Sequence, residues 1–526
     1  MRSVTECRTI SRRLPAPMFV LLTALTLAAP LVAENRRGGG QGGAGGSDPA
    51  AAGQIRPAAT YDDNAASGAN RVMVLLNRGV TQELLAELLQ NGVVHGWVER
   101  YRLVSMTLNG SDRDAVRRLA FVDSVETDSP VFADSAGTWD RDLIDVTDVE
   151  ETGIIGDPDS REVRETGAGV HVAVIDSGLV PDWRDFLPED RVDTSLARAI
   201  TGGPQAVIPV SNTYDQPTEL WERDTCAHGT AVASHVIGFN AGGVRVDGAA
   251  PGVTVIPIKV LFESGSSCSA FTSQIIAGID YVTRLVEAGT IGRTVINMSL
   301  GGPSPSPAEA RAIDDAIAAG IIVVASAGNR GERGMGWPGA FPQVISAGAI
   351  GWTRQFQPGT DSAPNTRFWW TQDVAFDPDR GRASEAEEVF VAGFSSRAIP
   401  SLVAGFPQEL DVMAPGQSTV APFPAPSSGG QSSGLFFING TSFSAPLTAG
   451  AAALLLEKDP TLGQADVEAI LKSSALPISP AGVAPGVVLA GDVSWDGDCG
   501  GVFCDPVGSG LLQVDDALAA ASRPGR

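Results

Sequence analysis

The sequence changes character at Gly440-Thr441-Ser442-Phe443-Ser444-Ala445-Pro446. A loop-like segment rich in Ser, Gly and Pro, residues 422–434, precedes this stretch, and an apolar run, residues 447–456, follows it. The change predicts a tight glycine turn and then a buried helix with Ser442 in its first turn. The first N–H groups of a helix lack partners and lie at its positive end, which suits a nucleophile that generates an oxyanion. The alternative is that Ser442 only caps the helix.

A serine nucleophile needs an adjacent base, and that base needs a third group to orient it. His228 lies in Ala227-His228-Gly229-Thr230, ahead of an apolar helical stretch at 231–239. Asp176 closes the apolar run 172–175, as expected at the carboxyl end of a buried parallel strand. Asp, His and Ser follow one another in one of the known triad orders. We predict that His171 and His235 are structural, His235 being a weak metal candidate.

Five blocks of sequence surround these residues and follow one another in a fixed order. They are Val172–Gly178, Ala227–Thr230, Asn297–Gly302, Ala325–Asn329 and Gly440–Pro446. In sequence and order they resemble the blocks of the subtilisin-like serine proteases, the subtilase family. The resemblance covers roughly residues 170–520. The chain has no H-E-x-x-H motif, which argues against a common zinc protease.

The resemblance implies a role for each of eight residues. Asp176, His228 and Ser442 would form the catalytic triad, and Asn329 would donate to the oxyanion. Substrate-binding residues would be Ser299, Leu300, Gly301 and Gly328. Because such strands recognise mainly the backbone of a polypeptide substrate, the expected activity is that of a serine endopeptidase of broad specificity. The alternatives are a narrow-specificity processing protease and an inactive binding homologue, which would be expected to lack a triad member.

Composition limits the partners. The chain has 526 residues, 43% of them hydrophobic, which is enough for a large core. Its net charge of −24 argues against nucleic acid or an anionic membrane as a partner.

The N-terminal residues predict export. Residues 1–33 have a basic start and an apolar stretch at 19–29 that is too short to span a membrane, as in a secretory signal peptide. A membrane anchor is the alternative. Residues 34–70 are rich in Gly and Ala and predict a disordered linker. We therefore expect a secreted, extracellular protein, with the periplasm as the other destination and no membrane contact after signal cleavage.

Residues 71–134 predict a small α+β domain. Their β-α-β-β-α-β order is ferredoxin-like, with strands expected at 71–76, 93–98, 102–108 and 121–126 and helices at 81–90 and 111–120. The segment resembles the inhibitor-type propeptide of subtilases, which implies a self-processed zymogen whose propeptide acts as an intramolecular inhibitor. Processing is expected between Phe132 and Trp139. The alternative is an independent binding module fused to a protease.

Residues 139–526 predict the peptidase domain. Strand and helix patterns alternate there, which indicates an α/β fold. The expected architecture is the subtilisin-like three-layer fold, a mostly parallel sheet covered by helices on both faces. Three stretches exceed the short family pattern, and no role is assigned to them: 353–388, 397–408 and 476–507.

Four cysteines remain after the signal peptide is removed. In a secreted chain an even number suggests disulfides, and four cysteines allow three pairings. Cys499 and Cys504 are close in sequence, so a small loop closed by that pair is favoured, which leaves Cys226 with Cys268. By the resemblance, the latter two lie at the rim of the substrate cleft. The alternative is a free Cys226 thiol near His228.

The resemblance implies no cofactor for catalysis. Many subtilases bind structural calcium in the region that matches residues 240–248, but this loop offers few side-chain oxygens. The sequence therefore assigns no metal site and leaves acidic loops elsewhere as candidates.

The pocket for the residue before the cleaved bond has one unusual feature. By the resemblance its walls are 299–302 and 325–328, mostly backbone and small side chains, which leaves room for a large apolar side chain. Arg330 follows Asn329 directly and would lie at the rim. A guanidinium there should disfavour Lys and Arg and tolerate or attract acidic side chains. The alternative is an Arg330 that turns to solvent or pairs with Glu332.

Overall fold

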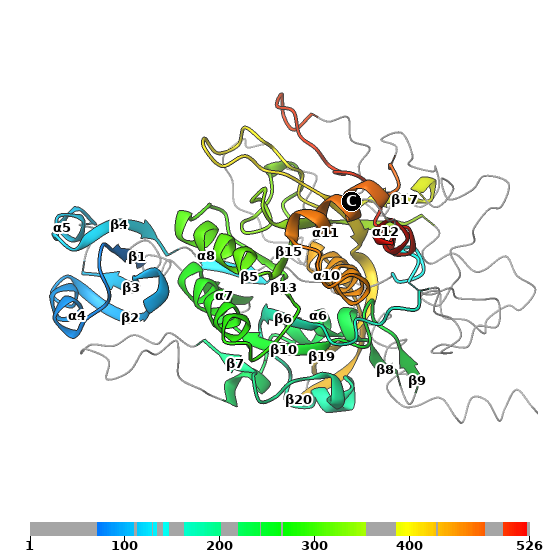
Figure 1. Cartoon of the computed structure of the whole chain (residues 1–526), viewed down its shortest axis with the longest axis horizontal. Coiled ribbons are helices and arrows are strands. Elements are labelled where there is room, and N and C mark those ends of the chain that lie inside the picture. The colour runs from blue at the N-terminus through cyan, green and yellow to red at the C-terminus, as the bar shows by residue number, and fades with distance from the viewer. Residues whose placement is uncertain are drawn as a thin grey trace, which may run out of the picture.

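A computed structural model describes most of the chain after residue 70. The described residues are 71–109, 113–128, 130–133, 140–146, 163–200, 219–241, 244–264, 267–353, 386–427, 430–478 and 498–522. They form a small body at one end and a large body beside it (Figure 1). The predicted signal peptide and linker lie outside the described residues, as does most of the stretch 353–388.

The small body has the predicted order of elements. Its antiparallel sheet has the spatial order β2-β3-β1-β4. The strands are β1 (Arg71–Leu76), β2 (Gly92–Val98), β3 (Leu103–Leu108) and β4 (Val122–Thr127), and the helices are α4 (Gln82–Leu88) and α5 (Arg113–Arg117). Val74, Leu85 and Met106 are among the side chains of its separate apolar core. Both helices are shorter than the sequence pattern indicated.

A mostly parallel sheet of eight strands runs through the large body. Its spatial order is β17 (Val389–Val391), β16 (Ile345–Trp352), β15 (Ile322–Ser326), β13 (Thr294–Met298), β6 (His171–Asp176), β10 (Thr254–Lys259) and β7 (Arg198–Ala199), with β18 (Val412–Pro415) also on β16. Only β17 pairs antiparallel, on β16. The central strands are near-continuous apolar runs because helices bury both faces.

Helices cover this sheet on both sides, as Figure 1 shows. They are α6 (His228–Ile237), α7 (Thr272–Glu287), α8 (Pro307–Ala318), α10 (Thr441–Lys458), α11 (Gln464–Ser474) and α12 (Val514–Ala521). Short 3₁₀ turns are η3 (Glu99–Tyr101), η5 (Trp183–Asp185), η6 (Glu189–Arg191), η8 (Glu219–Glu222) and η9 (Gly331–Arg333). The predicted α/β architecture with three layers is therefore present.

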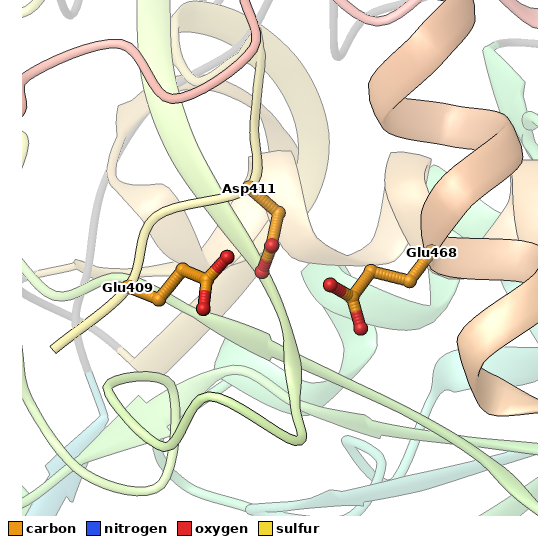
Figure 2. A group of neighbouring side chains, drawn as sticks. All are labelled: Glu409, Asp411 and Glu468. Atoms are coloured by element: carbon orange, nitrogen blue, oxygen red, sulfur yellow. The ribbon is translucent and has the colours of Figure 1, made fainter. Parts of the chain in front are cut away.

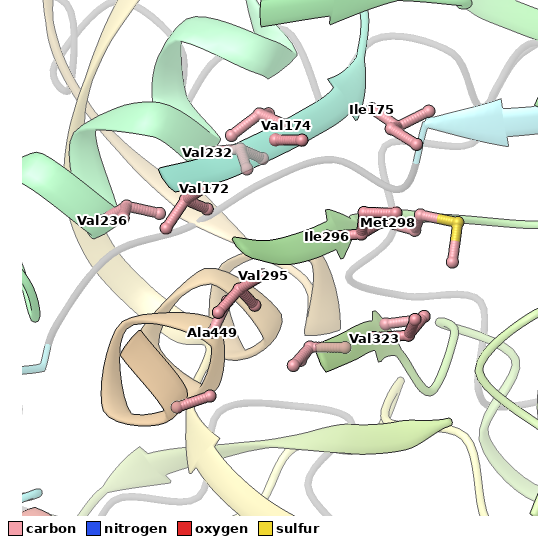
Figure 3. Close-up of a cluster of buried hydrophobic side chains, with 14 of the residues drawn as sticks. Val172, Val174, Ile175, Val232, Val236, Val295, Ile296, Met298, Val323 and Ala449 are labelled. Carbon is pink, nitrogen blue, oxygen red and sulfur yellow. The ribbon is translucent and has the colours of Figure 1, made fainter. Parts of the chain in front are cut away.

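Side-chain alternation along the strands divides the core between the two layers of helices. Val172 of β6 points toward Val236 of α6, and Val295 of β13 points toward Ala449 of α10 (Figure 3). Ile175 points to the opposite face, where Gly278 of α7 approaches it. The pattern follows from the two-residue period of a strand.

A second, antiparallel sheet joins the two bodies. Its order is β11 (Phe262–Ser264), β12 (Ser267–Phe271), β5 (Pro130–Ala133) and β14 (Leu300–Gly301). The segment that follows the small body in the chain thus lies as a strand between two strands of the large body.

Residues 417–439 form a hairpin, not the loop expected for 422–434. Strands β19 (Gln417–Ser427) and β20 (Gly430–Asn439) pair along their whole length. Pro422, Pro424 and Pro426 occupy alternate positions of β19. Alternate residues direct their N–H groups to the same side of a strand, so all three missing donors fall on the outer edge, where no pairing is lost. A smaller hairpin, β8 (Phe239–Ala241) and β9 (Val244–Val246), occupies the region first considered for calcium.

Two disulfides are present, Cys226–Cys268 and Cys499–Cys504, which is the pairing favoured from the sequence. The first links the segment before α6 to β12. Separately, within the part of the chain that the structure describes, no helix is both long and apolar enough to cross a membrane.

Candidate active site

The C-terminal end of β6 and the N-terminal end of α6 bring Asp176 and His228 together. His228 Nδ1 lies 2.8 Å from Asp176 Oδ1 and 3.0 Å from Oδ2. A carboxylate only accepts, so Nδ1 carries the proton and donates it. Both side chains are buried. The hydrogen bond fixes the ring tautomer and leaves Nε2 as the basic nitrogen.

Ser442 occupies the first turn of α10, as the sequence predicted. Pro446 has no N–H to donate to the carbonyl oxygen of Ser442, the i−4 acceptor in a helix. Ser299 Oγ donates to that oxygen instead, at 2.7 Å, and Asn297 Nδ2 donates to Ser299 Oγ at 3.0 Å. Ser442 Oγ lies 3.4 Å from the Ser299 carbonyl oxygen. Ser299, predicted as a substrate-binding residue, therefore lies directly against the candidate nucleophile.

Asn329 is held against the same helix start. Its Oδ1 accepts hydrogen bonds from Thr441 N and Thr441 Oγ1, both at 3.0 Å. The anchored oxygen fixes the plane of the amide and places the Nδ2 donor on the other side. Thr441 Oγ1 in turn accepts from Gly328 N at 3.0 Å, where a φ of +101° favours glycine. Asn329 and Gly328 are therefore positioned by the residue next to Ser442.

Backbone and small residues form the walls beside Ser442. Gly302 pairs with Trp337, and the Cα of Gly336 lies close to Gly301. On the opposite wall Ser396 Oγ accepts from Arg330 N at 2.9 Å. The Glu332 carboxylate accepts from Arg397 Nη1 at 2.9 Å.

Two edge strands flank these residues, and the sequence analysis identified only one of them. The predicted strand, β14, pairs with β5 through Leu300–Ala133 and Gly301–Phe132. The other, β12, pairs with β5 through Ser269–Phe132, Ala270–Val131 and Phe271–Pro130. β12 was missed because it is only five residues long and four of them are small, with no β-branched residue among them. An extended segment, β5, thus lies between β12 and β14.

His235 does not fit a metal site. Its Nδ1 lies 2.8 Å from the Ala231 carbonyl oxygen and its Nε2 lies 2.8 Å from Thr419 Oγ1. Burial lowers the pKa of His235 to about 3, so the ring stays neutral. The ring packs on Phe443, which also contacts His228.

An acidic cluster far from Ser442 in the sequence is the best candidate for a bound cation. Glu409 and Asp411 come from one segment and Glu468 from α11, and their carboxylates converge (Figure 2). Lys472 Nζ donates to all three, at 2.6, 2.9 and 3.2 Å. Burial raises the pKa of Asp411, and hydrogen bonds from Lys472 and Ser346 oppose that rise. Because the ammonium of Lys472 already supplies the cation, the cluster does not fit a calcium site.

Comparisons with known proteins agree on one family. The model of the subtilase family matches residues 167–500. Subtilisin DY of Bacillus licheniformis is 34% identical over 314 residues, which cover 59% of this chain and 84% of that protein. Subtilisin E of Bacillus subtilis (strain 168) is 33% identical over 314 residues, 59% of this chain and 61% of that protein. The match thus spans less than two thirds of Subtilisin E.

A solved structure shares the fold. It is that of fervidolysin from Fervidobacterium pennivorans, described as a keratinolytic enzyme related to subtilisin. The TM-score is 0.56 at 21% identity, over 86% of this chain and 61% of fervidolysin. At that identity the likeness concerns the fold alone.

The acidic cluster yields a test. Lys472→Met should lower the free energy of unfolding by about 1–3 kcal/mol, because three carboxylates, one of them buried, lose their cation. Millimolar calcium should then raise the unfolding temperature of the variant more than that of the wild type. Lys458→Met is the matched control, since Lys458 has the same 27% side-chain exposure but a single partner, Glu165, at 2.9 Å. Equal losses in both variants, measured by denaturant unfolding, would contradict the assignment.

Proposed function

The chain belongs to the subtilase family, and from that premise we propose that Asp176, His228 and Ser442 are the catalytic triad of a secreted, self-processed zymogen. The enzyme is a serine endopeptidase that hydrolyses polypeptides. The observation that carries the proposal is the buried hydrogen bond from His228 Nδ1 to Asp176 Oδ1, at 2.8 Å, together with a helix, Thr441–Lys458, that has Ser442 in its first turn.

In the proposed reaction Ser442 Oγ attacks the scissile carbonyl carbon. His228 Nε2 takes the hydroxyl proton and later gives it to the leaving amine. Asp176 holds the ring in the required tautomer and stabilises the imidazolium. Water then repeats the sequence on the acyl-enzyme, with His228 again as the base.

The oxyanion is bound by the Ser442 N–H and by Asn329 Nδ2. The hydrogen bonds from Thr441 to Asn329 Oδ1 support this role, because they fix the amide before the substrate arrives. Such preorganised donors act on charge that develops in the transition state. In subtilisin, a relative of this chain, loss of one such donor costs roughly 10²–10³ in turnover.

Labelling with a fluorophosphonate tests the triad. The mature protein should react at Ser442, and Ser442→Ala should abolish the label. Ser444→Ala is the matched control, since Ser444 lies on the same turn and bonds Ala414 O at 3.0 Å. Labelling that survives Ser442→Ala would place the nucleophile elsewhere.

The small body, residues 71–134, is proposed to be the propeptide. Two of its carboxylates bind the starts of two peptidase helices. Asp128 accepts from Ser273 N at 2.9 Å and Ser273 Oγ at 2.5 Å at the start of α7. Glu126 accepts from Ser306 Oγ at 2.8 Å, beside the start of α8. Carboxylates are favoured at helix N-termini, where N–H groups lack partners.

The strand β5 supports the inhibitory role. It lies between β12 and β14 as an added strand, which is how an extended substrate would bind. The Leu300–Ala133 pair is one residue from Ser299, which adjoins Ser442 Oγ. We therefore propose that the processed bond lies close to the end of β5, between Phe132 and Trp139.

Broad specificity follows from recognition through backbone, and Arg330 adds a preference at the first pocket. The narrow-specificity alternative differs in requiring side-chain contacts at several pockets. Two disulfides support an oxidising destination such as the extracellular space.

The isolated segment 71–134 should inhibit the mature enzyme, and the inhibition should weaken with rising pH. Burial raises the pKa of Glu309 to about 8, with Glu126 adding to the rise. In the mature enzyme without the segment, Glu309 should be exposed and its pKa should be near the ordinary value of about 4 to 5. The segment therefore docks more tightly when Glu309 is protonated. Its affinity for the mature enzyme should fall as the pH rises from about 4–5 to about 8, and it should change little above pH 8. Glu309→Gln should flatten the profile.

Inhibition constants of the segment 71–134, measured from pH 5 to 9, test both the inhibition and its pH dependence. Absence of any inhibition would refute the propeptide assignment. Inhibition with the same pH dependence in wild type and Glu309→Gln would refute only the role of Glu309. Ser442→Ala protein should also accumulate unprocessed.

Peptides that differ only in the residue before the cleaved bond test Arg330. Compared with Leu and Phe, Lys should be cleaved several-fold more slowly, and Glu should be tolerated. The effect should not exceed about 1 kcal/mol, because a charge at a rim is screened by solvent. Arg330→Ala should remove the discrimination, whereas Arg333→Ala, an exposed charge on the adjoining turn η9, should not. Equal rates for Lys and Leu peptides in the wild type would refute the charge argument.

A further inference from the structure

A buried charge pair adjoins the Asp176–His228 contact and is not used in the proposed reaction. Asp224 is fully buried four residues before His228, and Lys259, 4% exposed, ends the neighbouring strand β10. Lys259 Nζ lies 3.4 Å from Asp224 Oδ1 and 4.8 Å from the centroid of the Phe262 ring. Charged groups are rarely buried to this degree unless they are paired.

The pair is connected to both members of the Asp176–His228 contact through Ser177. Ser177 Oγ donates to Asp224 Oδ2 at 2.8 Å and accepts from Gly229 N, the residue after His228, at 2.8 Å. Lys259 Nζ donates to the Ser177 carbonyl oxygen at 2.5 Å. Ser177 N donates to Asp176 Oδ1 at 2.6 Å. Ser177 is thus hydrogen-bonded to both charged residues, to Asp176 and to the start of α6, so that it links the charge pair to the Asp176–His228 contact.

Asp224 also restrains the chain that enters α6. Its Oδ1 accepts from Cys226 N at 2.9 Å. Ala227, the next residue, has a φ of +61°, which an alanine adopts only at a cost. The bond from Asp224 holds the turn that delivers His228 in this unfavourable conformation. The disulfide from Cys226 to Cys268 adds a second restraint on the same turn.

We propose that Asp224 and Lys259 are positioning residues of the peptidase, which hold Asp176 and His228 in register through Ser177 and neutralise each other's charge beside the imidazole. The proposal rests on the proposed triad. Under this proposal the Asp224–Lys259 pair raises kcat and influences the pKa that determines the acid limb of the pH profile of kcat/KM. Neither residue contacts the substrate or the reacting atoms.

The charges around His228 determine the sign of the pH effect. They are Asp176 from β6, Asp224 from the preceding segment, Lys259 from β10, Glu263 beyond it, His235 on the same helix and Arg141 on the far side of that helix. Burial raises the pKa of Asp224 to about 6, and Lys259 opposes the rise. Burial lowers the pKa of Lys259, and Asp224 opposes that fall. With both groups ionised, the pair is neutral as a whole. Removing only its negative member leaves an uncompensated ammonium near the imidazole.

Asp224→Asn is therefore the decisive variant. The uncompensated Lys259 should disfavour the imidazolium, so the acid limb of kcat/KM should move to lower pH by about half a unit or more. In the double variant Asp224→Asn, Lys259→Met the limb should return to its wild-type position, because both charges are gone. The rate of both variants should stay below wild type, since the bonds to Ser177 Oγ and Cys226 N are weakened.

Asp411→Asn is the matched control. Asp411 is also buried and also bonded by a lysine and by a serine hydroxyl and N–H, but it precedes β18, which lies on β16. In the sheet β16 is three strands from β6, about 14 Å. Asp411→Asn should therefore destabilise the protein without moving the acid limb of kcat/KM.

Fluorophosphonate titration of active sites should normalise all rates, so that misfolded protein is not counted. An acid limb that stays in place in Asp224→Asn, or moves equally in Asp411→Asn, overturns the proposal. If Asp224→Asn yields no folded enzyme, Ser177→Ala decides, because it removes only the bridge. Its kcat should fall about tenfold or more at nearly unchanged KM, and an unchanged kcat overturns the proposal. Failure of the triad itself would show separately, as loss of labelling at Ser442.

Discussion

Four neighbouring parallel strands, β10, β6, β13 and β15, end at one edge of the central sheet, and the site depends on that shared edge. Asp176 ends β6, and Ser299 and Asn329 follow β13 and β15 within a few residues. Because the strands are adjacent, chain segments more than a hundred residues apart meet without long connections. The helix α10 then packs across the same strands and brings Ser442 to the edge. A shift of one residue in any strand would turn these side chains to the wrong face.

Several side chains at the site form hydrogen bonds with two partners each. Thr441 bonds both Asn329 and Gly328, Ser299 bonds both Asn297 and Ser442, and Ser177 links Asp224 to the start of α6. Small hydroxyl side chains suit this task, since each hydroxyl can donate once and accept twice. Such shared bonds restrain the groups that they join, although Asn297 Oδ1 is buried and has no partner among the described residues. The geometry around Ser442 is thus fixed by residues that need not touch a substrate.

The sequence predicted the features that depend on local pattern. Asp176 at a strand end and Ser442 at a helix start were recognisable because glycines and apolar runs border them. The hairpin β19–β20 was taken for a loop, because Ser, Gly and Pro are typical of loops, although prolines at alternate positions were a usable sign. The strand β12 and the Asp224–Lys259 pair were also missed. The strand β12 pairs with its neighbour β11, and Gly265-Ser266 between them was a usable hairpin sign. The Asp224–Lys259 pair exists only through a contact between segments that are distant in sequence, and such a contact leaves no local pattern.

The prolines of β19 have a consequence for contacts between molecules. An endopeptidase that binds extended chains between two strand edges can also accept strands of its neighbours, and the outer edge of a two-stranded hairpin carries no third strand in the described part of the chain. On that edge Pro422, Pro424 and Pro426 offer no N–H groups, so a second molecule could not form a continuous ladder of backbone hydrogen bonds with it. An extended chain that paired with this edge of the hairpin would therefore lack a hydrogen-bond donor at three alternate positions.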